Sequence, residues 1–210
     1  MRTTDTVAIS SLQQIANLKN LGYTKDVLLQ AIAEVYGEFS VSEPTRSWRE
    51  QDGVIYFSLM SDGTTGEEWI RRLEGNGFHV ENYVKQILRS PDFQPTSGVM
   101  TEIAVLKSRL FTDNDRIMKK IRAEADKRKF SKPNAEVACL IRAKFTDKEI
   151  KAMGLWWIVA MHEPIKDPDG FSYLLRADRF DIGCWFGTCD GNPDIRWNPG
   201  CGFAFVVSRK

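Results

Sequence analysis

Hydrophobic and polar positions along the chain predict an alternation of strands and helices. The runs VIYFSLM at 54–60 and GFAFVV at 202–207 are apolar and rich in β-branched or aromatic residues, which is typical of buried strands. EIAVL at 102–106 and LWWIVAM at 155–161 have the same character. These four runs predict the strands of a sheet.

Between these runs, apolar residues recur every three or four positions, which indicates helices. One helix is expected to begin after Thr64 or Thr65 and to end at Gly75, and another is expected over 81–89. Further helices are expected within 113–129, around 137–141 and after the capping-box pattern Thr-Asp-Lys-Glu at 146–149. The elements together predict an α+β protein in which helices pack on a small, mostly antiparallel sheet.

The N-terminal region has a separate pattern. Residues 5–36 carry two helical stripes that Gly22 separates, and a polar segment with Pro44 follows. We therefore expect a helical N-terminal appendage with its linker over residues 1–50 and one domain over 51–210. A helical hairpin this short cannot bury both stripes alone, so it should dock on the main domain or pair with a second copy. Homo-oligomerisation through these helices stays open.

Composition narrows the class of protein. With 210 residues and 42% hydrophobic content the chain can form a sizeable core, and its net charge of +1 gives no overall basic character that would favour nucleic acid as a partner. Neither a signal peptide nor a membrane span is expected, because the N-terminus has no apolar segment and no apolar run approaches 18 residues. A cytoplasmic location is the default expectation, and non-classical export stays open.

The four cysteines do not form a metal-binding pattern. Cys139 falls in an apolar helical stretch, and Cys184, Cys189 and Cys201 contain no CxxC pair that could hold a metal tetrahedrally. We expect free thiols, no metal and no cofactor.

The tail from Arg176 to Ser208 differs in composition from the rest of the chain. Between Lys166 and Lys210 there is no Lys, Glu, Gln or Met, although these four types account for 39 of the 210 residues. Ordinary loop chemistry explains the many Gly, Asn and Asp residues there, but it does not explain the missing types. Free replacement of the two adenines in the Asn codon AAC yields most of the residues present, and it cannot yield Lys, Glu, Gln, Met or Trp.

This tail resembles the variable region of target proteins of diversity-generating retroelements, in which adenine-directed mutagenesis rewrites chosen codons on a C-type-lectin-like scaffold. The resemblance lies in the last forty or so residues. It implies a C-type-lectin-like domain with a variable region at about 176–202. The implied framework positions are Trp185, Pro193, Trp197, Gly202 and Phe203. The implied variable, ligand-binding positions are Gly187, Cys189, Asp190, Gly191, Asn192, Ile195, Arg196, Asn198, Pro199, Gly200 and Cys201, and Phe186 is added as a large side chain beside them.

The expected function is recognition of varied partners, foremost proteins, through this C-terminal surface, without enzymatic chemistry. An enzyme with a site around His162, Glu163 and tail residues such as Asp190 or Asp194 stays open as an alternative. A helical module that contacts nucleic acid through the basic segment 119–129 is a third interpretation. Asp113, Asp115, Glu124 and Asp126 interrupt the longer charged segment 113–129, so a solvated helix face is the preferred interpretation.

Overall fold

The structure is a computed structural model, and it describes residues 46–180 and 183–208. The chain divides into two compact units, Met1–Arg46 and Ser47–Lys210. The predicted N-terminal helices, and any oligomer contact through them, lie outside the described residues. The predicted boundary after residue 50 falls within the first strand, β1 (Arg49–Gln51).

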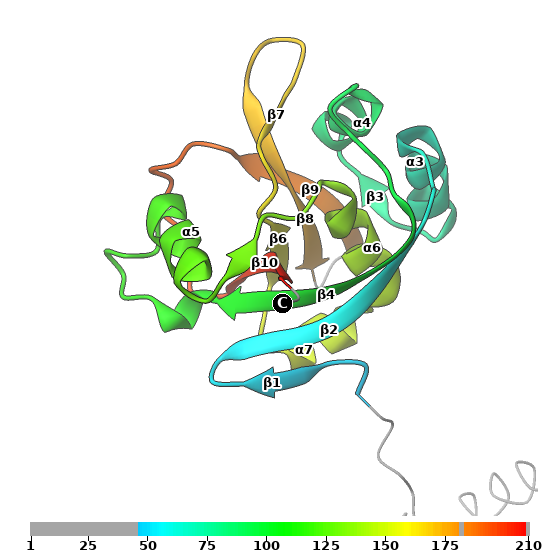
Figure 1. The fold of residues 1–210 in the computed structure, drawn as a ribbon. Helices are drawn as coiled ribbons and strands as arrows, with labels where there is room; N and C mark the ends of the chain where they lie inside the picture. Colours follow the sequence, from blue (N-terminus) through cyan, green and yellow to red (C-terminus); the bar gives the residue numbers. More distant parts are fainter. Residues whose placement is uncertain (1–45, 181–182, 209–210) are drawn as a thin grey trace, which may run out of the picture. The chain divides into compact units, whose positions relative to one another are not determined.

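A ten-stranded mixed sheet forms the centre of the described region (Figure 1). After β1 its strands are β2 (Val54–Asp62), β3 (His79–Val80), β4 (Ser97–Lys107), β5 (Phe130–Ser131), β6 (Trp157–Ala160), β7 (Ile165–Lys166), β8 (Ser172–Phe180), β9 (Gly183–Asp190) and β10 (Cys201–Val207). The strand order is β1-β2-β4-β10-β6-β8-β9-β3, with β5 paired to β10 and β7 paired to β8. Only the pairs β10–β6 and β3–β9 are parallel among these described strands. The α+β class is confirmed, and the sheet is larger than the small one expected.

Helices follow the predicted positions closely. They are α3 (Gly66–Gly75), α4 (Asn82–Arg89), α5 (Met118–Lys127), α6 (Glu136–Lys144) and α7 (Asp147–Ala152), with a short 3₁₀ turn η1 (Ser108–Leu110). Thr65 and Thr146 each close a capping box with the glutamate three residues later. The sequence predicted the box at Thr146 and left the cap of α3 open between Thr64 and Thr65. These caps satisfy backbone donors at the starts of α3 and α7, where no intrahelical partner exists.

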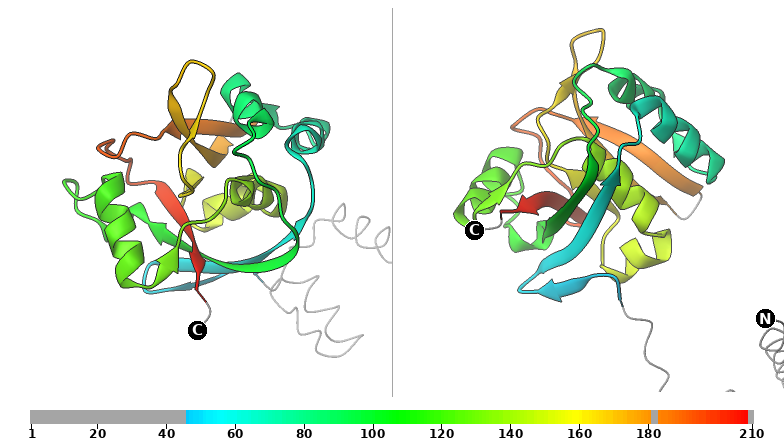
Figure 2. Two further views of the ribbon diagram at one scale, coloured as in Figure 1. Left: turned by 45° about the horizontal axis from the view of Figure 1, so that its top comes forward. Right: turned by 45° about the vertical axis from the view of Figure 1, so that its right-hand side comes forward.

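The two faces of the sheet are covered by different elements. A larger apolar cluster joins one face to α3, α4, α6 and α7, and a second cluster joins the other face to α5 and to the segment before β10. Figure 2 shows α5 on the opposite side of β10 from α6. Side chains of β10 alternate between the clusters, because Ala204 belongs to the first and Phe203 and Phe205 to the second. All three are at most 1% exposed, so the centre of the C-terminal strand is internal, while Val206 and Val207 at its end are half-buried.

Phe203 provides a test of this central position. Its ring is buried, and its backbone pairs with Leu106 of β4 and Val159 of β6. We expect Phe203→Ala to lower the free energy of unfolding by about 3–5 kcal/mol through lost burial and a cavity. Phe171→Ala removes the same ring at a position that is 64% exposed and should cost less than about 1 kcal/mol. Denaturant titration of both variants measures the difference, and equal losses would contradict an internal β10.

Candidate functional site

The C-terminal tail is only partly the long loop that the sequence predicted. Its first part is an antiparallel hairpin in which β8 pairs with β9 from Tyr173 opposite Asp190 onward. The irregular segment is residues 191–200, between β9 and β10, and we call it the tail loop. Trp185, an implied framework position, lies in β9, and the centroid of its ring is 4.1 Å from that of His79. Residues that point to opposite faces alternate along β8 and β9, as they do in strands, and this explains why the segment forms a hairpin and not a loop.

The tail loop is anchored by Trp197. This side chain is 6% exposed and meets the ring of Phe203 edge to face at 5.4 Å. Its backbone N–H donates to the carbonyl of Arg116 at 2.8 Å, and Arg196 forms an antiparallel bridge with Ile117. The loop is thereby fixed to the segment that leads into α5.

The same loop completes the start of α5. Ile117 stands at the N-cap position, where its apolar side chain cannot accept a hydrogen bond from the helix. The backbone N–H of Lys119 donates instead to the carbonyl of Pro193 at 3.4 Å. A backbone oxygen of the tail loop therefore does at α5 what a capping side chain does at α3.

Three polar side chains brace the turns of this region from within. Asp190 accepts from the backbone N–H of Asn192 at 2.8 Å, and Asn192 accepts from that of Asp194 at 3.0 Å. Asn198 accepts from Gly200 at 2.9 Å. Such bonds two residues ahead are the usual turn chemistry of Asn and Asp. The loop conformation thus depends on backbone bonds, Trp197 and these short local contacts.

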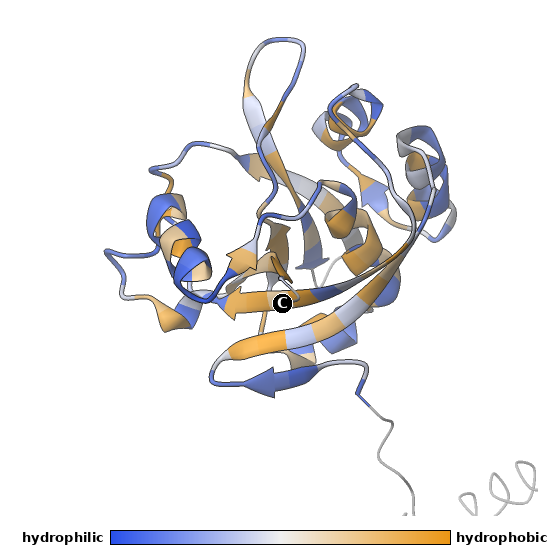
Figure 3. Ribbon diagram, viewed as in Figure 1, coloured by the Kyte–Doolittle hydropathy of each residue, from blue (hydrophilic) through white to orange (hydrophobic). Residues whose placement is uncertain are grey.

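Some of the expected variable positions lie on the surface. Seven are exposed or partly exposed with side chains beyond the backbone: Cys189, Asp190, Asn192, Ile195, Arg196, Asn198 and Pro199. Ile195 is half-buried against the second apolar cluster. Pro193, which was expected to be a framework residue, is exposed, and so is Asp194. In Figure 3 the tail loop and α5 carry mostly hydrophilic residues, in contrast to β2 and β4.

Other expected surface positions are corrected by the structure. Phe186 is 0% exposed because the alternation along β9 turns its side chain toward the first apolar cluster, on the face that α3, α4, α6 and α7 cover. Its partner in β8 is Ala177. Cys201 is also 0% exposed, at the start of β10, and burial raises the pKa of its thiol to about 12. Cys189 is half-buried and packs on the second cluster, and burial raises the pKa of this thiol too.

The three glycines of the expected variable set are buried where neighbouring atoms come close. A Cβ at Gly191 would lie 2.8 Å from Cβ of Pro164 and 3.0 Å from the carbonyl oxygen of Ser172. At Gly200 it would collide with Cδ1 of Trp156. At Gly187 it would lie 2.6 Å from Oδ2 of Asp178, at the end of a flexible side chain. These positions serve close approach of the backbone, and they do not offer a surface.

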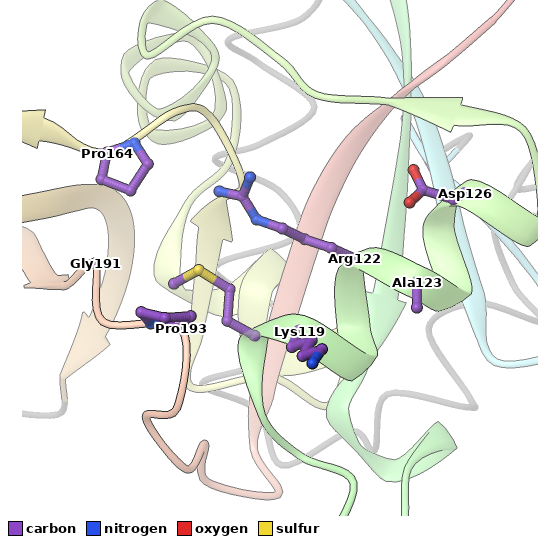
Figure 4. A pocket seen from close by; sticks show the side chains of 8 residues that line it. Lys119, Arg122, Ala123, Asp126, Pro164, Gly191 and Pro193 are labelled. Atoms are coloured by element: carbon purple, nitrogen blue, oxygen red, sulfur yellow. The ribbon is translucent and has the colours of Figure 1, made fainter.

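A groove runs between α5 and the tail loop and has a volume of about 410 Å³ (Figure 4). It is lined by Met118, Lys119, Arg122, Ala123, Asp126, Pro164, Gly191 and Pro193. The α5 members follow a spacing of three and four residues and so share one face of the helix. Gly191 and Pro193 belong to the tail, so the groove has one wall from each segment.

Arg122 forms the inner end of this groove. Figure 4 shows its side chain reaching from α5 toward Pro164. Its Nη2 donates to the carbonyl of His162 at 2.9 Å, and its Nη1 lies 3.6 Å from the carboxylate of Glu163. The Nε of Arg122 is enclosed and makes no hydrogen bond within the described residues. The guanidinium is therefore held in place while part of its donor capacity is unused.

The His162–Glu163 pair has the geometry of a structural element. His162 is 2% exposed, its Nε2 accepts from the backbone N–H of Leu175 at 3.0 Å, and its Nδ1 lies 2.6 Å from the carbonyl oxygen of Glu163. Burial lowers the pKa of His162 to about 4, which leaves the ring neutral with its proton on Nδ1. Both nitrogens are occupied, so the ring has no free position for proton exchange with a ligand. Glu163 is exposed, and its hydrogen bond with Lys132 lowers its pKa.

The basic side chains of segment 119–129 face solvent. Lys119 and Lys120 are exposed at the start of α5, whereas Lys127 and Arg128 pair with Glu124 at 3.7 and 2.8 Å. Acidic and basic side chains thus alternate around the helix, which fits the preferred interpretation of a solvated face.

Sequence reasoning missed a polar cluster on the hairpin. Asp178 of β8 has a side chain with 0% exposure, and its Oδ1 lies 3.1 Å from Nε of Arg176. Glu81, which follows β3, reaches the same place and accepts from the backbone N–H of Thr188 at 3.1 Å. Burial raises the pKa of Asp178 to about 7, against the opposing effect of Arg176. The alternation Arg176, Ala177, Asp178 indicated a shared face, but Glu81 is far away in sequence.

Among the described residues, no group of three or more His, Cys, Asp or Glu side chains is arranged to hold a metal ion. Cys139, Cys189 and Cys201 are free thiols. No helix in the described part of the chain is both long and apolar enough to cross a membrane.

Gly191→Ala tests whether the tail loop depends on close approach to Pro164. The added methyl group would meet a rigid ring and a backbone oxygen, so we expect a loss of about 1–3 kcal/mol in the free energy of unfolding. Arg196→Ala truncates an exposed side chain of the same loop and should stay within about 0.5 kcal/mol. If thermal unfolding gives both variants the stability of the wild type, position 191 tolerates side chains as a variable surface position would.

The buried carboxyl of Asp178 should make stability depend on pH. Its pKa is about 7 in the folded state and 3.8 ordinarily, so between these values the folded state holds a proton that the unfolded state has released. Stability from this group therefore falls as pH rises from about 4 to about 7, by at most about 1.4 kcal/mol per pH unit. His162 acts in the opposite direction, because its pKa is lowered from 6.5 to about 4 and stability is lost as pH falls.

The comparison of wild type with Asp178→Asn separates the two effects. The variant should gain stability relative to wild type by on the order of 2 kcal/mol or more between pH 4.5 and pH 7.5. Asp194→Asn, an exposed carboxylate in the tail loop, should leave the profile of the wild type unchanged. Urea unfolding at several pH values measures both differences. Parallel profiles for wild type and Asp178→Asn would show that Asp178 is ionised in the folded state.

The site can also be set beside known proteins. No protein-family model, no curated protein and no solved structure matches this chain. What the surface around the tail loop can bind therefore has to follow from its own side chains.

Proposed function

We propose that this chain is a ligand-binding protein of the kind that diversity-generating retroelements diversify, with a C-type-lectin-like domain whose C-terminal surface recognises varied partners, foremost proteins. The proposal includes no enzymatic step. The tail loop between β9 and β10 is the centre of that surface.

One observation carries the proposal: the main anchors of the loop backbone are Trp197 and backbone hydrogen bonds, and its outward side chains Asn192 and Asn198 add only local turn bonds. Trp197 anchors it in the core, and backbone bonds join it to Arg116 and to Lys119 at the start of α5. A surface that accepts many different side chains requires a rigid framework of this sort. Asn192, Asp194, Arg196, Asn198 and Pro199 are exposed on that framework.

The absence of Lys, Glu, Gln and Met from 167–209 is the second support. These types are common in exposed loops and strands elsewhere in the chain, so burial does not account for the gap. Codon replacement at adenines accounts for it directly, and the exposed asparagines at 192 and 198 are the residue type that the unmodified codon AAC encodes.

A pair of libraries tests the proposal on the protein. In the first, the five exposed positions named above receive codons with free first and second bases and a third-position C. Each position should cost no more than about 1 kcal/mol, because only short turn bonds are lost. We expect most members to fold, by thermal unfolding, and to yield binders against unrelated protein targets.

The matched library places the same codons at five buried positions, and we expect most of its members to unfold. These positions are Phe186, Gly191, Trp197, Cys201 and Phe203. If both libraries fold equally often, or if the first yields no binder, the tail is not a recognition scaffold.

The genome offers a separate test. We expect a near-copy of the codons for 176–202 that differs only at adenines and lies beside a reverse transcriptase gene. Differences at all four bases would contradict diversification.

A further inference from the structure

The groove between α5 and the tail loop combines an apolar lining with charged side chains of opposite sign at its two ends. Met118, Ala123, Pro164 and Pro193 give it an apolar lining, and the charged side chains in it are Lys119, Arg122 and Asp126. Lys119 and Arg122 lie one helical turn apart at one end, and Asp126 lies about 10 Å further along α5 than Lys119. An apolar cavity of about 410 Å³ with a few convergent polar groups has the size and composition of a binding site.

The positive end of the groove is only partly neutralised from within. Lys119 is exposed and has no ion pair within the described residues. Arg122 contacts Glu163 only at 3.6 Å, and Glu163 also pairs with Lys132. A carboxylate placed between these two cations would gain a charge-assisted contact that the free protein lacks.

The two walls of the groove differ in origin. Gly191 and Pro193 come from the tail, whereas the other six residues lie outside it. Because the carbonyl of Pro193 is bonded to Lys119 at 3.4 Å, the walls keep their spacing when exposed loop side chains change. A fixed feature beside a variable surface suits a contact that many partners share.

We propose that this groove receives an apolar side chain flanked by carboxylates on a partner protein. The apolar side chain lies against Met118, Ala123 and Pro193, and a carboxylate lies at the Lys119 and Arg122 end. The inference rests on the proposed function, since it takes the tail side of the domain as the recognition surface and adds the chemistry of the partner.

Nucleic acid suits this groove less well. Single strands bind through aromatic side chains on which bases stack, and no aromatic residue lines the groove. Phosphate groups gain nothing from an apolar floor, and Asp126 would repel them at one end. Nucleic acid is therefore an outcome of the test that contradicts the proposal.

The test uses the full chain with ¹³C-methyl-labelled methionine and four probes. These are blocked hexapeptides of alternating Glu and Leu, of alternating Glu and Ser, and of alternating Lys and Leu, together with a single-stranded oligothymidylate. The Glu and Leu peptide should bind at least about fivefold more tightly than each of the others. It should shift the methyl signal of Met118, which lines the groove, and leave that of Met100, which is 48% exposed on β4, in place.

Matched variants on one helix locate the contact. Lys119→Glu reverses a charge in the groove and should weaken the Glu and Leu peptide by at least about fivefold. Lys120→Glu makes the same change on the next exposed residue, outside the groove lining, and should change the affinity less than about twofold. Ala123→Trp fills the groove from an exposed helical position and should abolish the shift of Met118 without unfolding the protein.

Several results would overturn the proposal. They are equal weakening by Lys119→Glu and Lys120→Glu, tighter binding of the Lys peptide or the oligothymidylate, and no shift of Met118 with any peptide at millimolar concentration. Binders from the diversified library separate this inference from the proposed function. If they bind the Ala123→Trp variant as well as the parent, the groove is not used although the tail is a recognition surface. If the library yields no binder but Met118 still shifts, diversification fails and the groove remains a peptide site.

Discussion

The structure depends on the burial of β10 in the middle of the sheet. This last strand lies between β4 and β6, and its residues Phe203, Ala204 and Phe205 contribute to both apolar clusters. Because β9 is also internal to the sheet order, the tail loop is bounded by fixed strands at both ends. Loop residues can then differ widely in side chain while the path of the chain stays the same. Any disturbance of β10 affects the two clusters together.

The tail loop and α5 stabilise one another across the second face of the sheet. The loop offers the carbonyl of Pro193 to the first turn of α5, and α5 offers Met118 and Ile121 to the cluster that buries Trp197. Isolated helices of ten residues are marginal in water, so α5 needs this packing and this backbone contact. The groove lies between these same two segments, with Met118 and Pro193 both in its lining.

Local patterns in the sequence predicted most elements but not their partners. The capping box at Thr146 and the runs at 54–60 and 202–207 depend on neighbouring residues, and each was placed correctly. The β8–β9 hairpin was missed because the Gly, Asn and Asp content of the tail suggested a loop. The face of Phe186 depends on strand register with Ala177, and the meeting of Glu81 with Asp178 joins distant segments. Neither follows from a window of adjacent residues. The C-type-lectin-like assignment stays a prediction.

His162 illustrates how the same residue can suggest chemistry in the sequence and support a binding site in the structure. Its ring bonds to the backbone of Leu175 on β8, and its own carbonyl accepts from Arg122 on α5. His162, which is 2% exposed, thus links the hairpin to the inner end of the groove through two hydrogen bonds. Protonation of the ring would break the first bond, because Nε2 would become a donor facing an N–H. The lowered pKa of His162 therefore preserves the bond to Leu175 in mildly acidic solution, whereas Arg122 is held separately by the backbone carbonyl of the same residue.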